Sequence, residues 1–310
     1  MHRKIIPYLD DIEAILEGKF RLPITCEIDP SNRCQNECNF CMYANYRKEN
    51  PVDLDFGVYL NLINNLRKLG VKSITFTGGG EPLVHPEIRN MILAAQDFEL
   101  GLTTNGIFLN RVFDLLGHFE WVRISLDAAT SKTYRLLKGT DFFNRVIDNV
   151  KIALDEKIEL IDIGLSYVIS KGNEHEIEKA QILAKDLGVD YIQIKPAYQK
   201  YDLNYCISGN NQSFVLKRYV ASTGVPCAAA HLIGIVGADA NVYYCCQGRG
   251  RKEFVVGTIK YGASFEQIWM NRMEMNPQCH VKTCRYMNYA KGYERYSKQS
   301  NTILRHKNFL

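Results

Sequence analysis

The chain has 310 residues, of which 46% are hydrophobic and 23% are charged. This balance is typical of a globular protein with one large domain, or with one domain and an appendage. Its 38 basic and 34 acidic residues give a formal net charge of +4, without the basic run that binds nucleic acid. No stretch approaches the roughly 20 apolar residues of a membrane span. We therefore exclude a disordered chain, a coiled coil and a dedicated nucleic-acid-binding protein, and we expect no membrane partner.

Cysteine is unusually frequent, with ten residues in the chain. The N-terminal segment 1–16 has three acidic residues where a signal peptide has an apolar core, so we expect a cytoplasmic protein. In that reducing compartment, cysteines serve metal binding or catalysis more often than disulfides. Most of them form an early triplet (Cys34, Cys38, Cys41) and a later group (Cys227, Cys245, Cys246, Cys279, Cys284), while Cys26 and Cys206 stand alone.

Strand-like apolar runs alternate with helical patterns through the first two thirds of the chain. After an N-terminal helical segment that ends near residue 18, the predicted strands are 24–30, 73–80, 98–104, 121–127, 161–169 and 191–196. The predicted helices between them are 57–69, one from 86, one from 110, 144–155 and 174–187. Such alternation predicts an α/β fold with right-handed parallel crossovers, and its number of repeats favours an incomplete barrel.

The alternation stops beyond residue 198, where tyrosine, asparagine and glycine become frequent. We therefore predict a boundary in this region, which gives an N-terminal helical segment (1–20), a partial barrel (21–205) and a small cysteine-bearing domain (206–310). Ligands of parallel α/β proteins bind at the carboxyl ends of the strands. The active site is expected at that edge.

The early triplet directly follows the first predicted strand, with the spacing C-x3-C-x2-C. Three thiolates on one short loop can bind three irons of an iron–sulfur cube and leave the fourth iron open to an external ligand. Ferredoxin clusters and structural zinc sites instead use four protein ligands. The alternatives are a zinc knuckle or incidental cysteines. We predict that Cys34, Cys38 and Cys41 bind a 4Fe-4S cluster.

This spacing, with Phe40 before the last cysteine, resembles the signature of the radical S-adenosylmethionine (SAM) superfamily. The resemblance implies a partial (β/α)6 barrel of the TIM type. It also implies that SAM chelates the open iron and is reductively cleaved to a 5′-deoxyadenosyl radical, so that the cofactor supplies the difficult chemistry. A flavodoxin- or ferredoxin-type protein would donate the electron.

A glycine-rich run, Gly78-Gly79-Gly80-Glu81-Pro82, ends the second predicted strand and resembles the GGEP motif of that superfamily. The resemblance implies that Gly79, Gly80 and Glu81 bind the SAM ammonium, as suits a carboxylate that faces a cation. It also places four further residues at the SAM site: Phe40, Asn105, Ser125 and Asp127. An ordinary strand-to-helix turn is the structural alternative, and the strand-end residues Ser166 and Lys195 are expected to be satisfied polar groups.

Four later cysteines, Cys227, Cys245, Cys279 and Cys284, are enough to close a second cluster. Their order, together with the turn at 239–245 and the GTI and SFEQIW runs that follow it, resembles the SPASM/twitch extension of radical SAM enzymes. The resemblance implies one auxiliary 4Fe-4S cluster, with Cys246 as the alternative to Cys245. Ala240 departs from the glycine that the family carries in this turn. A structural zinc ion is the other occupant for four thiolates.

We expect a small-molecule substrate, namely a sugar- or aminocyclitol-like compound that loses a hydrogen atom and passes an electron to the auxiliary cluster. The chain shows no N-terminal extension large enough for a peptide-recognition domain, which favours this reading. The first alternative is an epimerase or cross-linking maturase of a ribosomally made peptide, with Cys206 as the candidate hydrogen donor. An alternative of another class is a non-catalytic zinc-binding scaffold.

Overall fold

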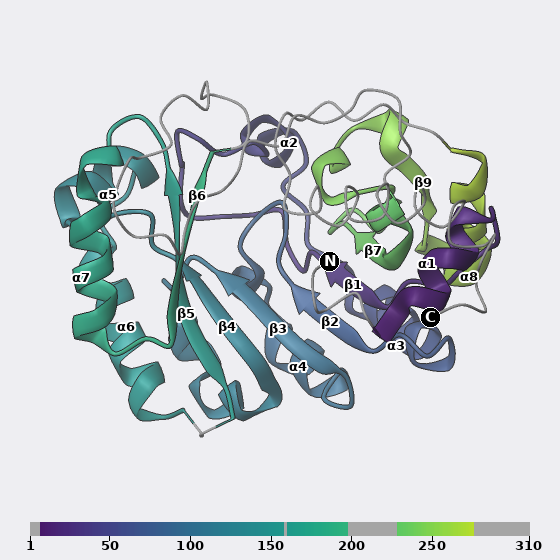
Figure 1. Cartoon of the computed structure of the whole chain (residues 1–310), viewed down its shortest axis with the longest axis horizontal. Coiled ribbons are helices and arrows are strands. Elements are labelled where there is room, and N and C mark those ends of the chain that lie inside the picture. The colour runs from purple at the N-terminus through teal and green to yellow at the C-terminus, as the bar shows by residue number, and fades with distance from the viewer. Residues whose placement is uncertain (1–6, 158–159, 198–227, 276–310) are drawn as a thin grey trace, which may run out of the picture.

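The computed structural model describes residues 7–157, 160–197 and 228–275 (Figure 1). These residues form a nine-stranded sheet in the order β6-β5-β4-β3-β2-β1-β7-β8-β9. Strands β1 to β7 are parallel, while β8 and β9 are antiparallel. The strands are β1 (Thr25–Ile28), β2 (Ser73–Phe76), β3 (Glu99–Thr104), β4 (Phe119–Ser125), β5 (Asp162–Ile169), β6 (Tyr191–Pro196), β7 (Ile233–Val236), β8 (Asn241–Tyr243) and β9 (Val255–Thr258).

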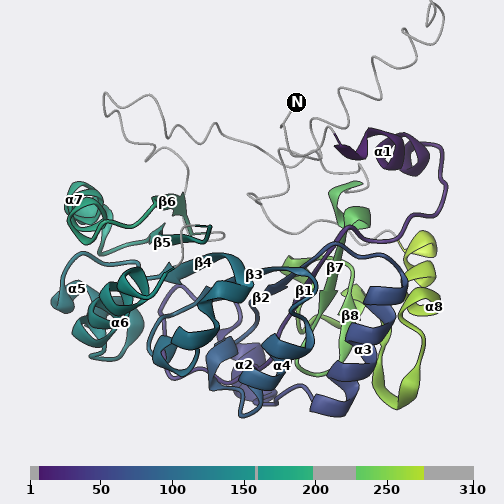
Figure 2. The same cartoon turned by 90° about the horizontal axis from the view of Figure 1, so that it is seen from below.

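Helices connect successive parallel strands and cover the sheet. Helices α3, α4 and α6 lie on one side of it, and α1 lies on the other (Figure 2). The helices are α1 (Leu9–Leu16), α2 (Ala44–Glu49), α3 (Phe56–Lys68), α4 (Ile88–Ala94), α5 (Ser131–Lys138), α6 (Phe143–Asp155), α7 (Ile177–Leu187) and α8 (Phe265–Met270). Within the described ranges, none of the helices has the length and apolar character needed to span a bilayer.

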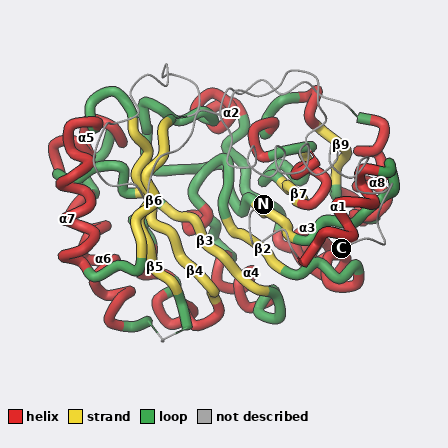
Figure 3. The backbone as a smooth tube through the Cα atoms, viewed as in Figure 1, coloured by secondary structure: helices red, strands yellow, loops and turns green. Residues whose placement is uncertain are grey.

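The predicted fold class is confirmed. Strands β1 to β6 follow one another in the sheet in chain order, as expected of the sequential crossovers of a partial barrel, and Figure 3 shows β2 to β6 side by side. All six predicted strands occur, and the last one, 191–196, has the predicted bounds. The parallel core is therefore the structure that the alternation of apolar periods indicated.

The predicted helix from residue 110 is wrong. The chain forms two 3₁₀ segments there instead, Leu109–Arg111 and Phe113–His118. Leu109, Val112 and Leu115 are all buried, and their spacing of three residues puts them on one face of a 3₁₀ turn, which has three residues per turn. An apolar spacing of three residues fits a 3₁₀ turn as well as the start of an α-helical period.

Between β1 and β6, two helices were not predicted, α2 and α5. Helix α5 nevertheless has clear end signals: the Thr130 side chain accepts a hydrogen bond from the Thr133 N–H at 3.3 Å, and Gly139 ends the helix in the left-handed conformation with φ of 70°. The eight residues between them carry a strongly polar face. Short length and polarity concealed this helix, which bears directly on the site.

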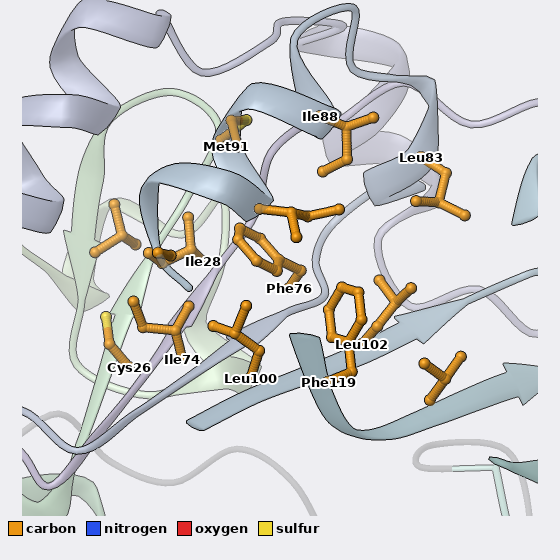
Figure 4. Packing of buried hydrophobic residues seen from close by; sticks show 14 of the residues in the cluster. Cys26, Ile28, Ile74, Phe76, Leu83, Ile88, Met91, Leu100, Leu102 and Phe119 are labelled. Atoms are coloured by element: carbon orange, nitrogen blue, oxygen red, sulfur yellow. The ribbon is translucent and has the colours of Figure 1, made fainter. Parts of the chain in front are cut away.

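The hydrophobic core lies between the sheet and the helices α3 and α4. Alternate residues of neighbouring strands point into it, including Cys26 and Ile28 of β1, Ile74 and Phe76 of β2, and Leu100 and Leu102 of β3 (Figure 4). All six are at most 1% exposed, and complete burial of an aliphatic or aromatic side chain contributes roughly 1.5–3 kcal/mol. This packing holds the strand ends from which the site is built. It also confirms that Cys26 is a buried apolar residue.

The segment after residue 228 continues the sheet. Strand β7 pairs with β1 in parallel, with Cys26 opposite Gly234. The turn that follows places Ala240 at φ of 63°, a left-handed conformation that costs roughly 1–2 kcal/mol without glycine. This is the position at which the SPASM/twitch resemblance implies glycine. The predicted boundary near 206 lies outside the described residues, so the division into 21–205 and 206–310 stays a prediction.

Candidate functional site

The three early cysteines lie on the loop that leaves β1. All three are free thiols of intermediate burial. The middle of the loop is bound to the last turn of α5, because the Glu37 N–H donates to the Lys138 carbonyl at 2.8 Å and the Asn39 N–H donates to the Leu137 carbonyl at 3.0 Å. The unpredicted helix α5 therefore positions the predicted cluster loop.

Cys34 and Cys41 both lie close enough to Cys38 to raise the pKa of its thiol. Among the residues that the structure describes, no three His, Cys, Asp or Glu side chains are grouped so that they could hold a single ion. In a four-iron cluster each cysteine binds a different iron, so the sulfurs need not meet at one point. Three cysteines on one loop can therefore bind three corners of an iron–sulfur cube.

Burial raises the pKa of the Cys38 thiol to about 11, although the nearby Lys138 ammonium acts in the opposite direction. Burial also raises the pKa of Cys34. In the metal-free protein both groups are therefore neutral thiols near pH 7. Because iron binds the thiolate, cluster assembly at these two residues releases protons.

Lys138 is a site residue that the sequence analysis missed. It is 2% exposed, its Nζ donates to the Ser125 carbonyl at 3.0 Å and pairs with Asp127, and it lies 5.4 Å from the centre of the Phe40 ring. Burial lowers the pKa of Lys138, but the neighbouring Asp127 carboxylate outweighs that effect and raises the pKa above its ordinary value. A permanent positive charge thus lies beside the cysteine loop. A lysine in the last turn of a helix is usually solvated, so nothing in the sequence indicated that this one is buried at the site.

Asp127 links the ends of β4 and β5. Its Oδ1 accepts from the Val168 N–H at 2.7 Å, its backbone carbonyl accepts from the Asn173 side chain at 2.8 Å, and its other carboxylate oxygen pairs with Lys138. The residue has a positive φ of 59°, an uncommon conformation outside glycine. These contacts engage the carboxylate within the chain, where the sequence analysis expected it to bind SAM.

The glycine-rich run packs against the residues that lead to Cys34. A Cβ on Gly80 would lie 2.4 Å from the Arg33 carbonyl oxygen, and the adjacent Glu81 N–H donates to that same carbonyl at 2.8 Å. Only glycine permits so close an approach of two backbones. The glycine-rich run is therefore in direct contact with the residues that immediately precede Cys34.

Glu81 lies under this contact and is 2% exposed. Its Oε1 accepts from the Thr104 hydroxyl at 2.6 Å and from the Leu83 N–H at 3.1 Å, and its Oε2 accepts from the Asn105 N–H at 2.7 Å. Burial raises the pKa of the carboxyl, and these hydrogen bonds oppose the rise. Glu81 thus joins the glycine-rich run to the end of β3, whatever ligand it meets.

The two C-terminal cysteines that the structure describes, Cys245 and Cys246, lie close to the residues after Cys41. The Tyr43 hydroxyl donates to the Cys246 carbonyl at 2.6 Å. Cys246 is buried and Cys245 is half-buried, and the choice between them as ligand stays open. The other predicted ligands and the candidate hydrogen donor lie outside the described residues: Cys227, Cys279, Cys284 and Cys206.

A buried arginine, which the sequence analysis also missed, anchors this segment to β1. The Arg249 Nε and Nη2 donate to the two Asp29 carboxylate oxygens at 2.7 and 2.9 Å, and Nη2 also reaches Glu27 at 3.0 Å. Asp29 in turn accepts from the Gly79 N–H at 3.1 Å. The guanidinium thereby connects the Cys245–Cys246 segment with the first strand and with the glycine-rich run.

Residues 28–184 match the model of the Radical SAM superfamily. The chain belongs to this superfamily. The match contains the three-cysteine loop, the glycine-rich run and the ends of β3 and β4, which the structure brings together at one edge of the sheet. Membership of the superfamily implies SAM and a 4Fe-4S cluster as cofactors.

Among curated radical SAM proteins, the probable GTP 3′,8-cyclase of Saccharolobus solfataricus is 28% identical over 169 residues, which are 53% of this chain and 54% of the relative. The GTP 3′,8-cyclase of Petrotoga mobilis is 28% identical over 194 residues, which are 58% of this chain and 59% of the relative. The chain thus spans somewhat more than half the length of the curated relatives it matches.

Solved radical SAM structures share the fold. Streptococcus suis SuiB bound to its precursor peptide SuiA superimposes with a TM-score of 0.63 at 15% identity, covering 86% of this chain and 69% of SuiB. The anSMEcpe structure with bound AdoMet gives a TM-score of 0.59 at 14% identity, covering 81% of both chains. At such low identity the likeness concerns the fold, which it confirms as a partial barrel.

Proposed function

We propose that Cys34, Cys38 and Cys41 hold three irons of a 4Fe-4S cluster, and that SAM binds the fourth. The observation that carries this proposal is the contact of the cysteine loop with the glycine-rich run at Gly80. At the same edge of the sheet, Glu81 would bind the SAM ammonium. Ser125 would supply a polar contact to SAM, and Phe40 an apolar one. Lys138 adds a cation that suits the negative charge of a thiolate-bound cluster.

The proposed substrate is a small polar molecule, of the sugar or aminocyclitol type. Because side chains alternate along a strand, the sheet face opposite the core carries the exposed Gln193 and polar residues of intermediate burial, namely Thr75, Thr103, Arg123, Ser125 and Lys195. The SAM-derived radical would take a hydrogen atom from a carbon that bears a hydroxyl, the hydroxyl would lose a proton, and an acceptor would take the remaining electron. The product is a ketone.

An auxiliary 4Fe-4S cluster, bound by Cys227, Cys245 or Cys246, Cys279 and Cys284, is the proposed acceptor of that electron. Four thiolates leave no open iron, so electron transfer is the chemistry that remains for this cluster. The position of Cys245 and Cys246 next to Tyr43, two residues after the SAM-cluster loop, supports a second centre near the first. A flavodoxin- or ferredoxin-type protein would supply the starting electron.

A nucleotide is the second candidate substrate. The observation that favours it is the 28% identity of the barrel to proteins named GTP 3′,8-cyclase, and Arg123 on the polar face of β4 suits a phosphate group. A peptide substrate remains the third outcome of the test. These candidates differ in the product and in the fate of the substrate hydrogen.

Anaerobic reconstitution tests the proposed function first. We expect a brown protein with about eight irons per chain, from two four-iron clusters, that forms 5′-deoxyadenosine when reduced with dithionite. A colourless protein that binds zinc would instead indicate the non-catalytic scaffold. Deuterated aminocyclitols, GTP and peptides are then compared for deuterium transfer into 5′-deoxyadenosine, and transfer accompanied by oxidation of the hydroxyl-bearing carbon to a ketone identifies the dehydrogenase.

The role of the later cysteines is tested once a substrate is known. In the dehydrogenase, Cys206→Ala retains product formation, while the double variant Cys279→Ala and Cys284→Ala forms 5′-deoxyadenosine but no product. An epimerase shows the opposite pattern: Cys206 is essential, and solvent deuterium enters a substrate carbon.

A further inference from the structure

The side chain of Asn105 is directed at a cluster ligand. Its Nδ2 lies 3.7 Å from the Cys34 sulfur and donates to it. Its Oδ1 accepts from the Gln35 side-chain amide at 3.3 Å and from the Ile107 N–H at 3.0 Å. Because the Ile107 backbone N–H can only donate, the carboxamide oxygen must face it, and the nitrogen therefore faces the sulfur. Asn105 is 7% exposed, so the arrangement is enclosed.

The backbone of Asn105 is also fixed by hydrogen bonds. Its N–H donates to Glu81 Oε2 at 2.7 Å, while the neighbouring Thr104 hydroxyl donates to Oε1 at 2.6 Å. The Thr104 hydroxyl oxygen then accepts from the Gly106 N–H at 3.0 Å. A continuous set of hydrogen bonds thus runs from Glu81 through Asn105 to Cys34. Such support orients metal ligands in general.

We propose that Asn105 is a positioning residue for the cluster ligand Cys34, rather than a contact of SAM. Its N–H···S hydrogen bond fixes the orientation of the thiolate and withdraws negative charge from it. Reduction adds an electron to an already negative cluster, so a donor to sulfur stabilises the reduced state and raises the reduction potential. This inference rests on the proposed 4Fe-4S cluster.

Two variants separate this role from a SAM contact. Asn105→Ser removes the donor to sulfur but keeps a short oxygen that can accept from the Ile107 N–H. The matched control, Gln35→Ala, removes a neighbour of the same carboxamide and leaves the N–H···S bond. Both proteins are reconstituted in parallel with the wild type, and iron content, the midpoint potential of the cluster and SAM affinity are measured.

We expect the midpoint potential of Asn105→Ser to be more negative than that of the wild type and of Gln35→Ala, with SAM dissociation constants within about twofold of one another. An unchanged potential overturns the proposal, whether or not SAM affinity changes. An unchanged potential with SAM affinity about tenfold weaker would assign Asn105 to SAM. Failure of the wild type to assemble a four-iron cluster would contradict the proposed function instead.

A measurement on the wild type covers the case in which Asn105→Ser does not retain a cluster. Asparagine labelled with ¹⁵N at Nδ2 is incorporated, the cluster is reduced without SAM, and hyperfine coupling between the cluster and the labelled nitrogen is recorded. Coupling to an exchangeable side-chain N–H is expected. Its absence would show that no asparagine amide donates to a cluster sulfur.

Discussion

The two cysteine-bearing segments of this protein are held in place by different forces. The loop of Cys34, Cys38 and Cys41 is bound through neutral backbone hydrogen bonds to the end of α5. The segment of Cys245 and Cys246 is anchored by a buried guanidinium that pairs with two carboxylates of the β1 region. The first segment contains three proposed ligands within eight residues, whereas the proposed second site also needs cysteines from distant parts of the chain. Local spacing is sufficient for the first site but not for the second.

The two segments also contact each other. Tyr43, which follows the first loop, donates to the Cys246 carbonyl at 2.6 Å, and Arg249 donates to the same carbonyl at 2.9 Å. Asp29, which pairs with Arg249, connects these hydrogen bonds with the glycine-rich run by accepting from the Gly79 N–H. A substitution in one segment should therefore disturb the structure of the other. The two sets of substitutions should nevertheless differ in the reaction step that they abolish.

The largest effect is expected from the triple variant of Cys34, Cys38 and Cys41 to Ala. It removes every protein ligand of the SAM cluster while leaving the proposed auxiliary ligands, so iron should fall to about half. Formation of 5′-deoxyadenosine by the dithionite-treated protein should vanish. The matched control is Cys26→Ala, which removes a buried thiol outside both groups. Persistent 5′-deoxyadenosine in the triple variant would contradict the assignment of this loop.

Arg249→Met should have the next largest effect, this time on folding. It removes the guanidinium that pairs with the buried Asp29 and Glu27, and breaking a buried ion pair from one side costs about 3–5 kcal/mol. The free energy of unfolding, from denaturant titration, measures this loss. A change below about 1 kcal/mol would mean that water reaches the two carboxylates. Arg249→Lys keeps the positive charge but not the paired hydrogen bonds of the guanidinium. Its free energy of unfolding should therefore lie between those of the wild type and of Arg249→Met.

Glu81→Gln tests the link between the glycine-rich run and SAM. Loss of the carboxylate charge should weaken SAM binding by about 1.5–3 kcal/mol, the range of a hydrogen bond to a charged group. Glutamine still offers an oxygen to Thr104 or Asn105, so iron content should be retained. Calorimetric titration of the reconstituted variant measures the affinity. An unchanged affinity would restrict Glu81 to its contacts within the chain.

Arg67→Ala should have the smallest effect on the free energy of unfolding, and it serves as the reference for an exposed ion pair. Arg67 pairs with Asp97 on the surface, where both side chains are at least 40% exposed, and such pairs contribute about 0–1 kcal/mol. We expect a correspondingly small change in the free energy of unfolding, with iron content and SAM affinity unaltered. A loss comparable to that of Arg249→Met would remove the distinction between the buried and the exposed ion pairs.

The sequence alone was sufficient for the parallel core, and it supplies the prediction of the first cysteine site. Strand alternation and the C-x3-C-x2-C spacing are local patterns, because each depends on residues a few positions apart. For the same reason Cys26, in the middle of an apolar run, was correctly interpreted as a core residue. The 3₁₀ segments after β3 show the limit of such patterns, since an apolar spacing of three residues fits more than one kind of helix.

Only the tertiary structure decided which charged groups support the site. Asp29 and Arg249 are 220 residues apart in the chain, and Lys138 reaches the cysteine loop only because α5 folds back onto it. A lone arginine or lysine in a sequence is usually solvated, and its burial is favourable only where carboxylates and carbonyls from other strands already converge. These groups come together when β7 pairs with β1. The two strands are far apart in the sequence, so local hydrophobic periodicity does not predict their pairing.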